Sequence, residues 1–471
     1  MKQLKTAYDL ACERVIPSRI TYKNEQNDQE EQYSFDKTFD FIEIPEFSGR
    51  EDVVMDMEDT EEEKKKKEKK ETVMESGNIK VADNQKISYD NLPEVLWYGH
   101  FMDYGGFARI NRTMAFELCN RNVKVKLEIE PYLNHVNKST ENQLRILEQT
   151  EIKKTSPKVF GTTIPLNMFH SGKKILYTMI ETSEKVHKDY AERMNLMNEI
   201  WVATEYGKKI MQNSNVCTPS YVMPLGVDVE RYNSSAGQFN FGKAVRSFIF
   251  SSVFRWSYRK GFDLLLKAYM EEFSNNDDVS LCLVSRALEC PEKNGVERIV
   301  DDFNAIKSGI GKQEKDLPHV ALYTKPIPEY DMPKIYSSSH AFVLISRGEG
   351  FGLPYAEAGA SSIPVIASNC SGHTDFLKED NSYLVEPEGY IDANLNGNLP
   401  RMAKLCHFYQ GQKFPHFGED SIEQIKYHMR FVYENYSKAK IKAKKLQNLI
   451  KEKYTWDMAV DRVYKRILEC Q

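Results

Sequence analysis

The sequence predicts an α/β fold of two domains, each with a parallel sheet covered by helices. The chain of 471 residues is too long for one ordinary core. Short, almost wholly apolar strand candidates recur along it, joined through segments with helical spacing, which is typical of parallel sheets covered on both faces. Between Gly226 and Phe248 a polar stretch lacks periodicity. We expect the two domains to meet there.

Residues 1–90 differ in composition from the rest. The segment "EDVVMDMEDTEEEKKKKEKKETV" is a block of acids followed by a block of lysines, with few side chains to bury. Such a segment stays solvated, with transient helix through Glu–Lys pairs. We therefore expect residues 1–90 to be a low-complexity, mostly disordered extension. A docking tail for a partner is the alternative.

Residues 91–240 are expected to form the first Rossmann-like domain. The apolar run "EVLWYGHF" precedes a glycine turn, "GGFARINRTMAFELC" then has apolar residues at helical spacing, and "VKVKLEI" returns to a period of two. Further strands are expected in "KKILYTMIE", "NEIWVAT" and "SYVMPLG". This order of strand, turn, helix and strand predicts a parallel sheet.

Residues 241–448 are expected to form a second domain of the same kind. Its strand candidates are "SFIFSSVF", "VSLCLVS", "HVALYTK", "HAFVLIS" and "IPVIAS". The segment from Ser437 to Cys470 predicts one long helix. We assign residues 449–471 to a C-terminal helix that packs back towards the first domain.

The composition argues against several classes of protein. Acidic residues slightly outnumber basic ones, with a net charge of -5, so no nucleic-acid partner is expected. The eight cysteines are scattered without zinc-site spacing and are expected to be reduced thiols. No window reaches the ~20 apolar residues of a membrane span, and no signal peptide is evident. We expect the protein in the cytoplasm or peripherally at the cytosolic face of a membrane; its oligomeric state stays unknown.

The stretch "SRGEGFGLPYAEAGASSIPVIAS" places Glu349 and Glu357 around a Gly-Phe-Gly turn. Pro354 suits the first turn of a helix, and the missing Cβ atoms of Gly350 and Gly352 would let a ligand approach the backbone. Free amides at this helix N-terminus predict an anion there. Those amides belong to Phe351, Gly352 and Leu353.

The two carboxylates are better suited to accept hydrogen bonds than to donate protons. Glu349 precedes the positive helix end, which favours its ionised form. A glycosidase needs one carboxyl with a raised pKa, so that interpretation is disfavoured. A ribose diol or a sugar ring would suit both groups. The structural alternative is that Glu357 supports the helix start and Glu349 caps a loop.

Two further turns follow strand candidates. In "SSVFRWSYRKGFDLLLKAYM", Arg255 and Lys260 lie at the carboxyl end of a strand, where ligands bind in doubly wound sheets, so they are candidate phosphate contacts. Solvated loop charges are the alternative. Gly105 and Gly106 follow the first strand of the other domain and would present backbone amides across the cleft. They are not part of a dinucleotide fingerprint.

Together these residues resemble the retaining glycosyltransferases of the GT-B fold, in particular family 4 (glycosyl transferases group 1), which carries an E-x7-E motif. The resemblance covers residues 93–471. It rests on the Gly-Gly turn, the crossover "MPLGVDVERY", the loop from Arg255 to Gly261, and "YSSSHAFVLISRGEGFGLPYAEAGASSIPVIAS"; "KYTWDMAVDRVYKRI" is similar to the family's terminal helix. It implies transfer of a hexose from a UDP- or GDP-linked sugar to a glycan, lipid-linked or other hydroxyl acceptor.

The resemblance also implies roles for individual residues. Arg255 and Lys260 would neutralise the donor's diphosphate, and Glu357 would accept from the ribose hydroxyls. Glu349 would hold the transferred sugar, together with the backbone of Gly350, Phe351, Gly352 and Leu353. Gly105 and Gly106 would let the first domain approach the β-phosphate. Glu349, Arg255 and Lys260 are the expected catalytic residues.

No metal or other cofactor is expected. The acidic pairs Asp277-Asp278 and Asp301-Asp302 fall in polar or helical segments, and no DxD cluster ends a strand. Arg255 and Lys260 would take the place of a metal cation.

The chain departs from the family where many members have a histidine in the sugar site. Here "ILYTMIETSEKVHKDY" places Glu181 or Thr182 near that position, and Glu181 is a candidate sugar or acceptor contact. The other candidates are His100, His187 and His373.

The acceptor class is not predicted. A contact with an anionic lipid surface through Arg109, Arg112, Arg121 or the lysines from Lys438 to Lys453 is one interpretation, and solvated helix faces are the other. A catalytically inactive GT-B module that binds a protein partner is the alternative function. A nucleotide-sugar epimerase is disfavoured by the E-x7-E spacing.

Overall fold

The structure of the chain is a computed structural model. It describes residues 92–103, 105–130, 136–163, 169–287, 295–393, 409 and 411–471, and before them only the short strands β1 (Thr21–Lys23), β2 (Glu30–Gln32) and β3 (Ile42–Glu43). The expectation of disorder in residues 1–90 otherwise lies outside the described residues.

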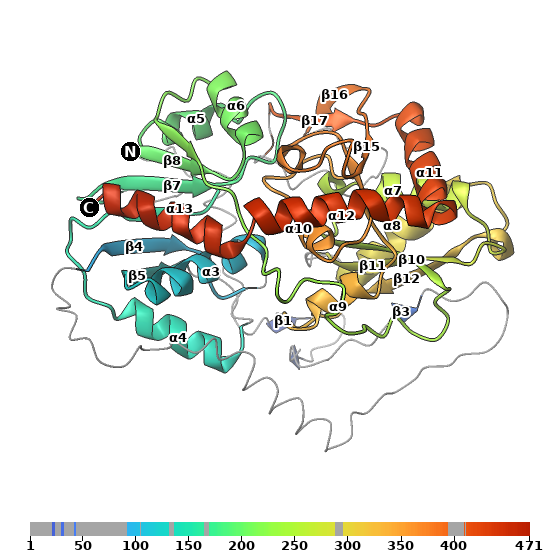
Figure 1. Ribbon diagram of the computed structural model, residues 1–471, viewed down its shortest axis with the longest axis horizontal. Helices are drawn as coiled ribbons and strands as arrows, with labels where there is room; N and C mark the ends of the chain where they lie inside the picture. The colour runs from blue at the N-terminus through green and yellow to red at the C-terminus, as the bar shows by residue number, and fades with distance from the viewer. Residues whose placement is uncertain are drawn as a thin grey trace, which may run out of the picture.

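The first half of the described chain folds around a six-stranded parallel sheet in the order β5-β4-β6-β7-β8-β9 (Figure 1). Its inner strands are mostly buried because helices cover the sheet, whereas the edge strand β5 alternates buried and more exposed residues. The strands are β4 (Glu94–Gly99), β5 (Lys124–Ile129), β6 (Lys158–Gly161), β7 (Lys174–Thr178), β8 (Glu199–Val202) and β9 (Ser220–Val222). The helices are α3 (Gly106–Asn120), α4 (Lys138–Glu148), α5 (Lys188–Met194) and α6 (Glu205–Asn213).

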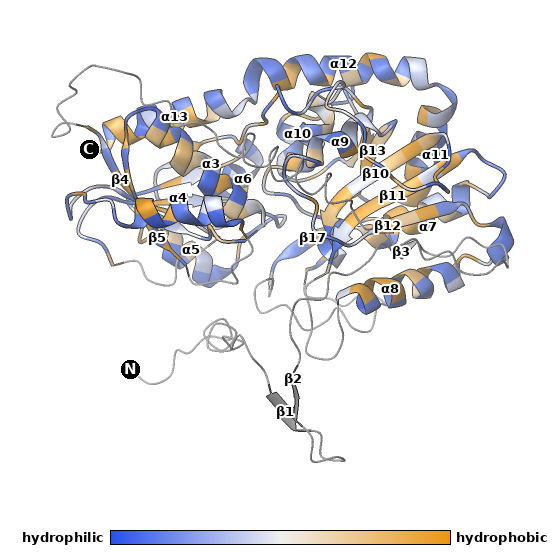
Figure 2. Cartoon of the chain, turned by 90° about the horizontal axis from the view of Figure 1, so that it is seen from below, coloured by the Kyte–Doolittle hydropathy of each residue, from blue (hydrophilic) through white to orange (hydrophobic). Residues whose placement is uncertain are grey.

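The second half contains a seven-stranded sheet in the order β15-β14-β13-β10-β11-β12-β3. All its strands are parallel except β3, which adds to the edge from within the predicted extension. Figure 2 shows β10 to β12 as a hydrophobic layer, and β11 is buried from Val279 to Ser285. The other strands are β10 (Phe248–Arg255), β11 (Val279–Arg286), β12 (His319–Tyr323), β13 (Ala341–Leu344), β14 (Val365–Ser368) and β15 (Tyr383–Val385).

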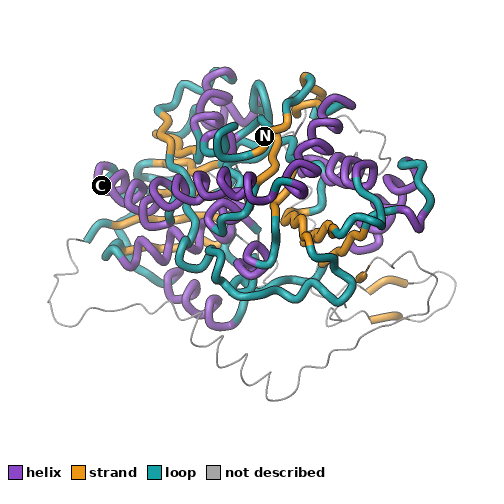
Figure 3. Tube along the Cα trace, turned by 45° about the vertical axis from the view of Figure 1, so that its right-hand side comes forward, coloured by secondary structure: helices purple, strands orange, loops and turns teal. Residues whose placement is uncertain are grey.

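Helices surround the strands of this second half as well (Figure 3). They are α7 (Phe262–Glu272), α8 (Gly295–Gly309), α9 (Met332–Ser337), α10 (Leu353–Ala360), α11 (Glu419–Glu434) and α12 (Tyr436–Lys453), with the short 3-10 turns η2 (Tyr258–Lys260), η3 (Glu314–Asp316) and η4 (Gly372–Asp375). Two parallel sheets covered by helices confirm the predicted α/β fold.

The prediction of one long C-terminal helix is wrong. Helix α12 ends at Lys453, and α13 (Trp456–Glu469) begins after Thr455, which has extended backbone and accepts a hydrogen bond from the Met458 N–H as its N-cap. In Figure 1, α12 lies along the second half and α13 lies along the first. The helix cannot continue through Thr455, because the backbone of this residue is extended. Its side chain instead satisfies one of the free amides at the start of α13.

Within residues 92–471, two described chain crossings join the halves, and they lie side by side. The Val227 N–H donates to the Tyr454 carbonyl at 2.8 Å. A Cβ on Gly226 would lie 2.3 Å from the backbone of Thr455. The first crossing therefore needs glycine at this position.

Buried Glu199 anchors α13 to the first half. It accepts hydrogen bonds from Arg466 of α13 at 2.6 Å and from Trp201 at 2.8 Å, and it lies 3.0 Å from the Lys173 ammonium. Burial opposes ionisation, but these donors outweigh it and lower the pKa of Glu199 below its usual range.

A small hairpin of the second half also contacts the first. It consists of β16 (Gly389–Asp392) and β17 (Lys413–His416). The Ser183 N–H donates to the Lys413 carbonyl at 2.9 Å. The two halves are thus held together by the crossings, by α13 and by this hairpin. Within the part of the chain that the structure describes, no helix is both long and apolar enough to cross a membrane.

Candidate functional site

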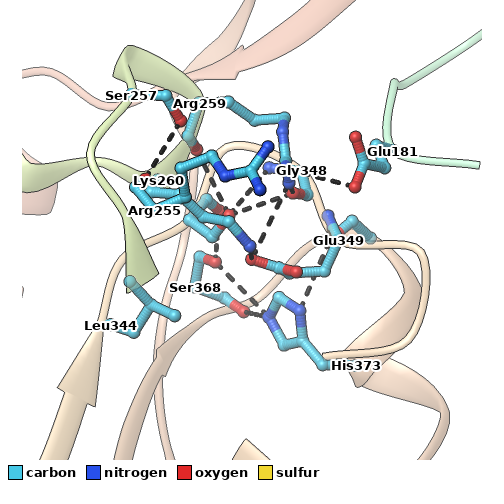
Figure 4. A network of polar contacts seen from close by, with 12 residues as sticks. Glu181, Arg255, Ser257, Arg259, Lys260, Leu344, Gly348, Glu349, Ser368 and His373 are labelled. Atoms are coloured by element: carbon cyan, nitrogen blue, oxygen red, sulfur yellow. Dashed lines mark hydrogen bonds and ion pairs between the residues drawn. The ribbon is translucent and has the colours of Figure 1, made fainter. Parts of the chain in front are cut away.

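The predicted site residues of the second half gather at the carboxyl ends of β10 and β13. Strand β10 ends at Arg255, and Lys260 closes the η2 turn that follows. Strand β13 ends at Leu344, and the motif loop from Ser346 to Gly352 leads into α10. Figure 4 shows that these two loops meet each other and face Glu181 of the first half. The sequence spacing alone had separated them by about ninety positions, and the parallel sheet brings them together because their strands are neighbours.

Lys260 and Glu349 form a buried ion pair. The Lys260 ammonium donates to Oε1 of Glu349 at 2.5 Å, and the two side chains are 11% and 6% exposed. Burial opposes ionisation of Glu349, but Lys260 and then Arg259 outweigh it, so the pKa of Glu349 lies below its usual range. Glu349 is therefore an ionised acceptor of hydrogen bonds, which agrees with the prediction from the helix end.

Arg259 links the two halves at this pair, a residue that the sequence reasoning missed. Its guanidinium lies 3.1 Å from Oε1 of Glu181 and 3.9 Å from Oε1 of Glu349, and it donates to the Gly348 carbonyl. Burial opposes its charge, but Glu181 and Glu349 keep the pKa of Arg259 above its usual value. In the sequence, Arg259 was visible only as a basic residue next to Lys260 before Gly261. Its role at the boundary became clear from its partner Glu181 in the first half.

Two glycines of the motif loop make room for the first half of the protein. A Cβ on Gly348 would lie 1.8 Å from the Glu181 carbonyl oxygen, and one on Gly350 would lie 2.4 Å from Cβ of Met179. The missing Cβ of Gly350 thus permits close approach of Met179 from the first half. Gly352 has a φ of +93°, and a Cβ there would meet Tyr355 of α10. Glycine is needed at this position because the turn into α10 requires a positive φ.

Arg255 lies where the two halves face each other at the Gly-Gly turn. Arg255 itself is exposed, and a Cβ on Gly105 would lie 3.5 Å from its Nη2. Gly105 is the N-cap of α3, so the first amides of this helix start beside a cation. A Cβ on Gly106 would meet no described atom within 4 Å. An exposed cation thus lies beside the start of α3, where the Gly105 N–H donates to the Asp103 carboxylate.

Glu357 lies in α10, with both carboxylate oxygens in hydrogen bonds to protein groups. Oε1 accepts from Nη1 of Arg109 at 2.5 Å, and Oε2 accepts from the Tyr336 hydroxyl at 2.8 Å. Its side chain is 3% exposed. The interpretation of Glu357 as a support for the helix is too limited, because its charged partner comes from α3 of the first half.

Two supporting side chains, Arg347 and His373, hold the two loops. Arg347 donates to both carboxylate oxygens of Asp263, at 2.8 and 2.6 Å, and stacks over the Tyr258 ring. His373 is fully buried, packs on the Tyr355 ring and contacts the Ser368 carbonyl at 2.7 Å. Burial lowers the pKa of His373 to about 4, so the ring is neutral near pH 7. His373 therefore supports the motif loop through these contacts with Ser368 and Tyr355.

The other histidine candidates do not join this group. His100 lies 3.4 Å from Glu130, and His187 caps α5 through the Asp189 N–H. Glu181 reaches the site from the first half, and its side chain is 30% exposed. Beside it lies a small pocket of about 20 Å³, partly open to solvent. Its lining includes Thr163, Met179, Glu181, Tyr190, Tyr409 and Gln412.

The arginines considered for a lipid surface are engaged within the protein. Arg112 is buried and donates to the carbonyls of Phe101 and Asp103. Arg109 pairs with Glu357, and Arg121 pairs with Asp457 of α13. The interpretation of these three arginines as a lipid-facing patch is therefore wrong, since helix α3 packs this side against the rest of the chain. As for metals, the described ranges contain no cluster of three or more His, Cys, Asp or Glu residues that could hold an ion.

Comparison with known proteins points to one family for the second half. Residues 246–396 match the family model described as Glycosyl transferases group 1. This range includes Arg255, Arg259, Lys260, Glu349 and Glu357.

Curated relatives match over short regions. D-inositol 3-phosphate glycosyltransferase of Corynebacterium diphtheriae is 24% identical over 157 residues, which cover 32% of the chain and 35% of that protein. O-antigen chain mannosyltransferase B of Escherichia coli is 43% identical over 71 residues, 15% of the chain and 18% of that protein. The match thus spans about a third or less of these two relatives.

Solved structures match over most of the chain. Anabaena Alr3699/HepE in complex with UDP and glucose has a TM-score of 0.55 at 11% identity, covering 80% of this chain and 99% of that one. Sucrose-phosphate synthase from Thermosynechococcus elongatus has a TM-score of 0.57 at 13% identity, covering 80% of this chain and all of the other. Identity this low supports the fold alone. The chain therefore has the two-domain GT-B fold, and its residues 246–396 match the Glycosyl transferases group 1 model.

Proposed function

We propose that the protein is a retaining glycosyltransferase of family 4, which moves a hexose from a UDP- or GDP-linked donor to a hydroxyl acceptor. The observation that carries this proposal is the group formed by Arg255, Arg259, Lys260 and Glu349. Three cations and a carboxylate lie at the strand ends of one half, and Glu181 of the other half faces them (Figure 4). Arg255 also lies beside Gly105 of the Gly-Gly turn. The match to Glycosyl transferases group 1 covers the same segment.

The cations suit the leaving group of such a reaction. When the bond from the anomeric carbon to the β-phosphate breaks, its electron pair leaves with the nucleoside diphosphate, and negative charge grows on the phosphate. Arg255 beside the N-terminus of α3 would stabilise this charge, with Lys260 and Arg259 behind it. We propose that these fixed cations serve in place of a metal ion.

The carboxylates suit the sugar and the ribose. Ionised Glu349, held by Lys260, would accept hydrogen bonds from the transferred hexose, and Glu357 would accept from the ribose. Glu181 and the pocket beside it are the proposed route for the acceptor hydroxyl, because they lie on the first-half side of Glu349. Retention of the anomeric configuration is proposed from the E-x7-E resemblance.

The proposed location is the cytoplasm, with peripheral contact to anionic lipid as an extension of it. After the exclusion of the α3 arginines, the candidates are the exposed lysines of α12: Lys438, Lys444, Lys445, Lys451 and Lys453. Their common charge would attract an anionic surface.

The test is transfer by the purified full chain. Radiolabelled UDP- and GDP-hexoses are offered, transfer or donor hydrolysis is counted, and NMR of the product gives its anomeric configuration. Lys260→Met and Glu349→Ala should each lower the rate at least about a hundredfold, because each removes a fixed charge from the site. Lys267→Met is the matched control, since Lys267 pairs with Glu419 at the surface. Equal rates in wild type and both site variants would refute the proposal.

Binding separates this function from the inactive-module alternative. UDP, GDP and ADP are compared by thermal shift, because a ligand that binds the folded state stabilises it. Stabilisation by one diphosphate identifies the donor class. If none of the three stabilises the chain and no sugar is transferred, the module that binds a protein partner becomes the better description.

A further inference from the structure

Arg109 reaches from α3 into the part of the second half where the ribose would lie. Its Nη1 donates to Oε1 of Glu357 at 2.5 Å, its Nη2 donates to the Tyr232 hydroxyl at 3.2 Å, and its Nε lies 3.4 Å from Oε1 of Glu329. The Arg109 side chain is 19% exposed. One arginine of the first half thus has three partners across the domain boundary.

Glu357 offers little room for a further ligand in this arrangement. Its other oxygen accepts from Tyr336, and its side chain is 3% exposed. A ribose diol that donates both hydroxyls to this carboxylate must come as close to it as Arg109 does now. The guanidinium and the diol therefore compete for the same surface of Glu357.

The structure provides a second carboxylate for Arg109. Glu329 is 49% exposed and already within 3.4 Å of Nε. Tyr232 packs under the guanidinium, with Cζ of Arg109 5.7 Å from the ring centroid. A small turn of the side chain would exchange Glu357 for Glu329 without leaving the arginine charge unpaired. The cost of releasing Glu357 is thereby reduced.

We propose that Arg109 is a positioning residue that competes with the nucleotide's ribose for Glu357. This inference rests on the proposed function, since it takes Glu357 as the ribose acceptor. Arg109 holds Glu357 in place across the boundary, and the ribose diol of a nucleoside diphosphate displaces it towards Glu329. Part of the binding free energy of the ribose is then used to open one contact between the halves, so nucleotide binding and domain position are coupled.

The test compares ribose with a sugar that lacks both hydroxyls. Affinities of UDP and GDP are measured by calorimetry beside those of their 2′,3′-dideoxy forms, for wild type, Arg109→Gln and Arg109→Lys. Arg109→Gln should bind the ribonucleotide about fivefold tighter, because the competing charge is gone and the binding-competent fraction rises. The dideoxy nucleotide should bind Arg109→Gln and wild type with the same affinity. Arg109→Lys keeps the charge and should stay near wild type.

Arg121→Gln is the matched control, because Arg121 lies on the same helix and pairs with Glu117 and Asp457 away from the site. It should change neither affinity. Thermal unfolding of each variant shows that it is folded.

Three results would overturn the inference. If Arg109→Gln changes the affinities for the ribonucleotide and the dideoxy nucleotide equally, the role of Arg109 is purely structural. If only the ribonucleotide binds more weakly, Arg109 assists the ribose contact. If neither affinity changes, Arg109 is irrelevant to the nucleotide. Failure of the proposed function looks different, because wild type would then bind neither UDP nor GDP.

Discussion

The pair of Lys260 and Glu349 makes the sharpest prediction. Lys260→Met keeps the length and most of the volume of the side chain and removes its charge. Glu349 would then be a buried carboxylate, 6% exposed. Arg259, 3.9 Å from Oε1 of Glu349, would still be a charged neighbour of it. A buried charge without its partner is strongly destabilising.

Removing one member of a buried ion pair costs about 3–5 kcal/mol. Because Arg259 compensates in part, we expect the lower end, about 3 kcal/mol, which is a fall of about 6–12 °C in Tm for a domain of this size. Glu349→Gln in the same chain removes the unpaired charge. The double variant Lys260→Met with Glu349→Gln should therefore be more stable than Lys260→Met alone, while its transferase activity stays lost.

The assay is a double-mutant cycle by thermal or urea unfolding, with transfer activity measured on the same samples. Lys267→Met is the control, because the Lys267–Glu419 pair has the same ion types at 2.6 Å with side chains 35% and 79% exposed. Exposed pairs contribute about 0–1 kcal/mol, so this variant should stay close to wild type. A coupling free energy below about 0.5 kcal/mol between Lys260 and Glu349 would refute the reasoning.

Three further predictions concern the contacts between the halves. Glu199→Gln should be less stable than wild type near pH 7, and it should lose less stability on acidification. The reason is that a carboxyl with a lowered pKa stabilises the fold above its unfolded pKa, and this stabilisation is lost as the pH falls through the folded pKa. Urea unfolding at several pH values measures the difference. Gly226→Ala should cost about 2 kcal/mol through its clash at the crossing, whereas Gly309→Ala, with no described atom within 4 Å of its Cβ, should be near neutral in thermal unfolding. Gly348→Ala should push the motif loop away from the Glu181 carbonyl, raise the radius of gyration in solution scattering and lower kcat/KM at least about tenfold; an unchanged kcat/KM would contradict this role.

The fold could be predicted from local patterns. Apolar strands such as "VSLCLVS" and "HAFVLIS" can be buried on both faces only in a covered parallel sheet, and the structure has them as β11 and β13. The helix start at Leu353 also follows from the glycine turn and Pro354. The ionised state of Glu349 was predicted from the helix end, but in the structure its lowered pKa comes from Lys260 and Arg259. The break at Thr455 was missed, because the segment from Ser437 to Cys470 was interpreted as one continuous helix.

The partners across the domain boundary were decided only by the tertiary structure. Arg109 and Glu357 lie 248 positions apart, and no periodicity links them. Arg259 finds Glu181, and Gly348 fits the Glu181 carbonyl, because the crossings set how the two halves face each other. Local sequence patterns were enough to predict two covered parallel sheets and the charged groups at their strand ends, because both depend on neighbours along the chain. Which charge meets which depended on the docking of the halves, since ion pairs form between groups that are close in space whatever their separation in sequence.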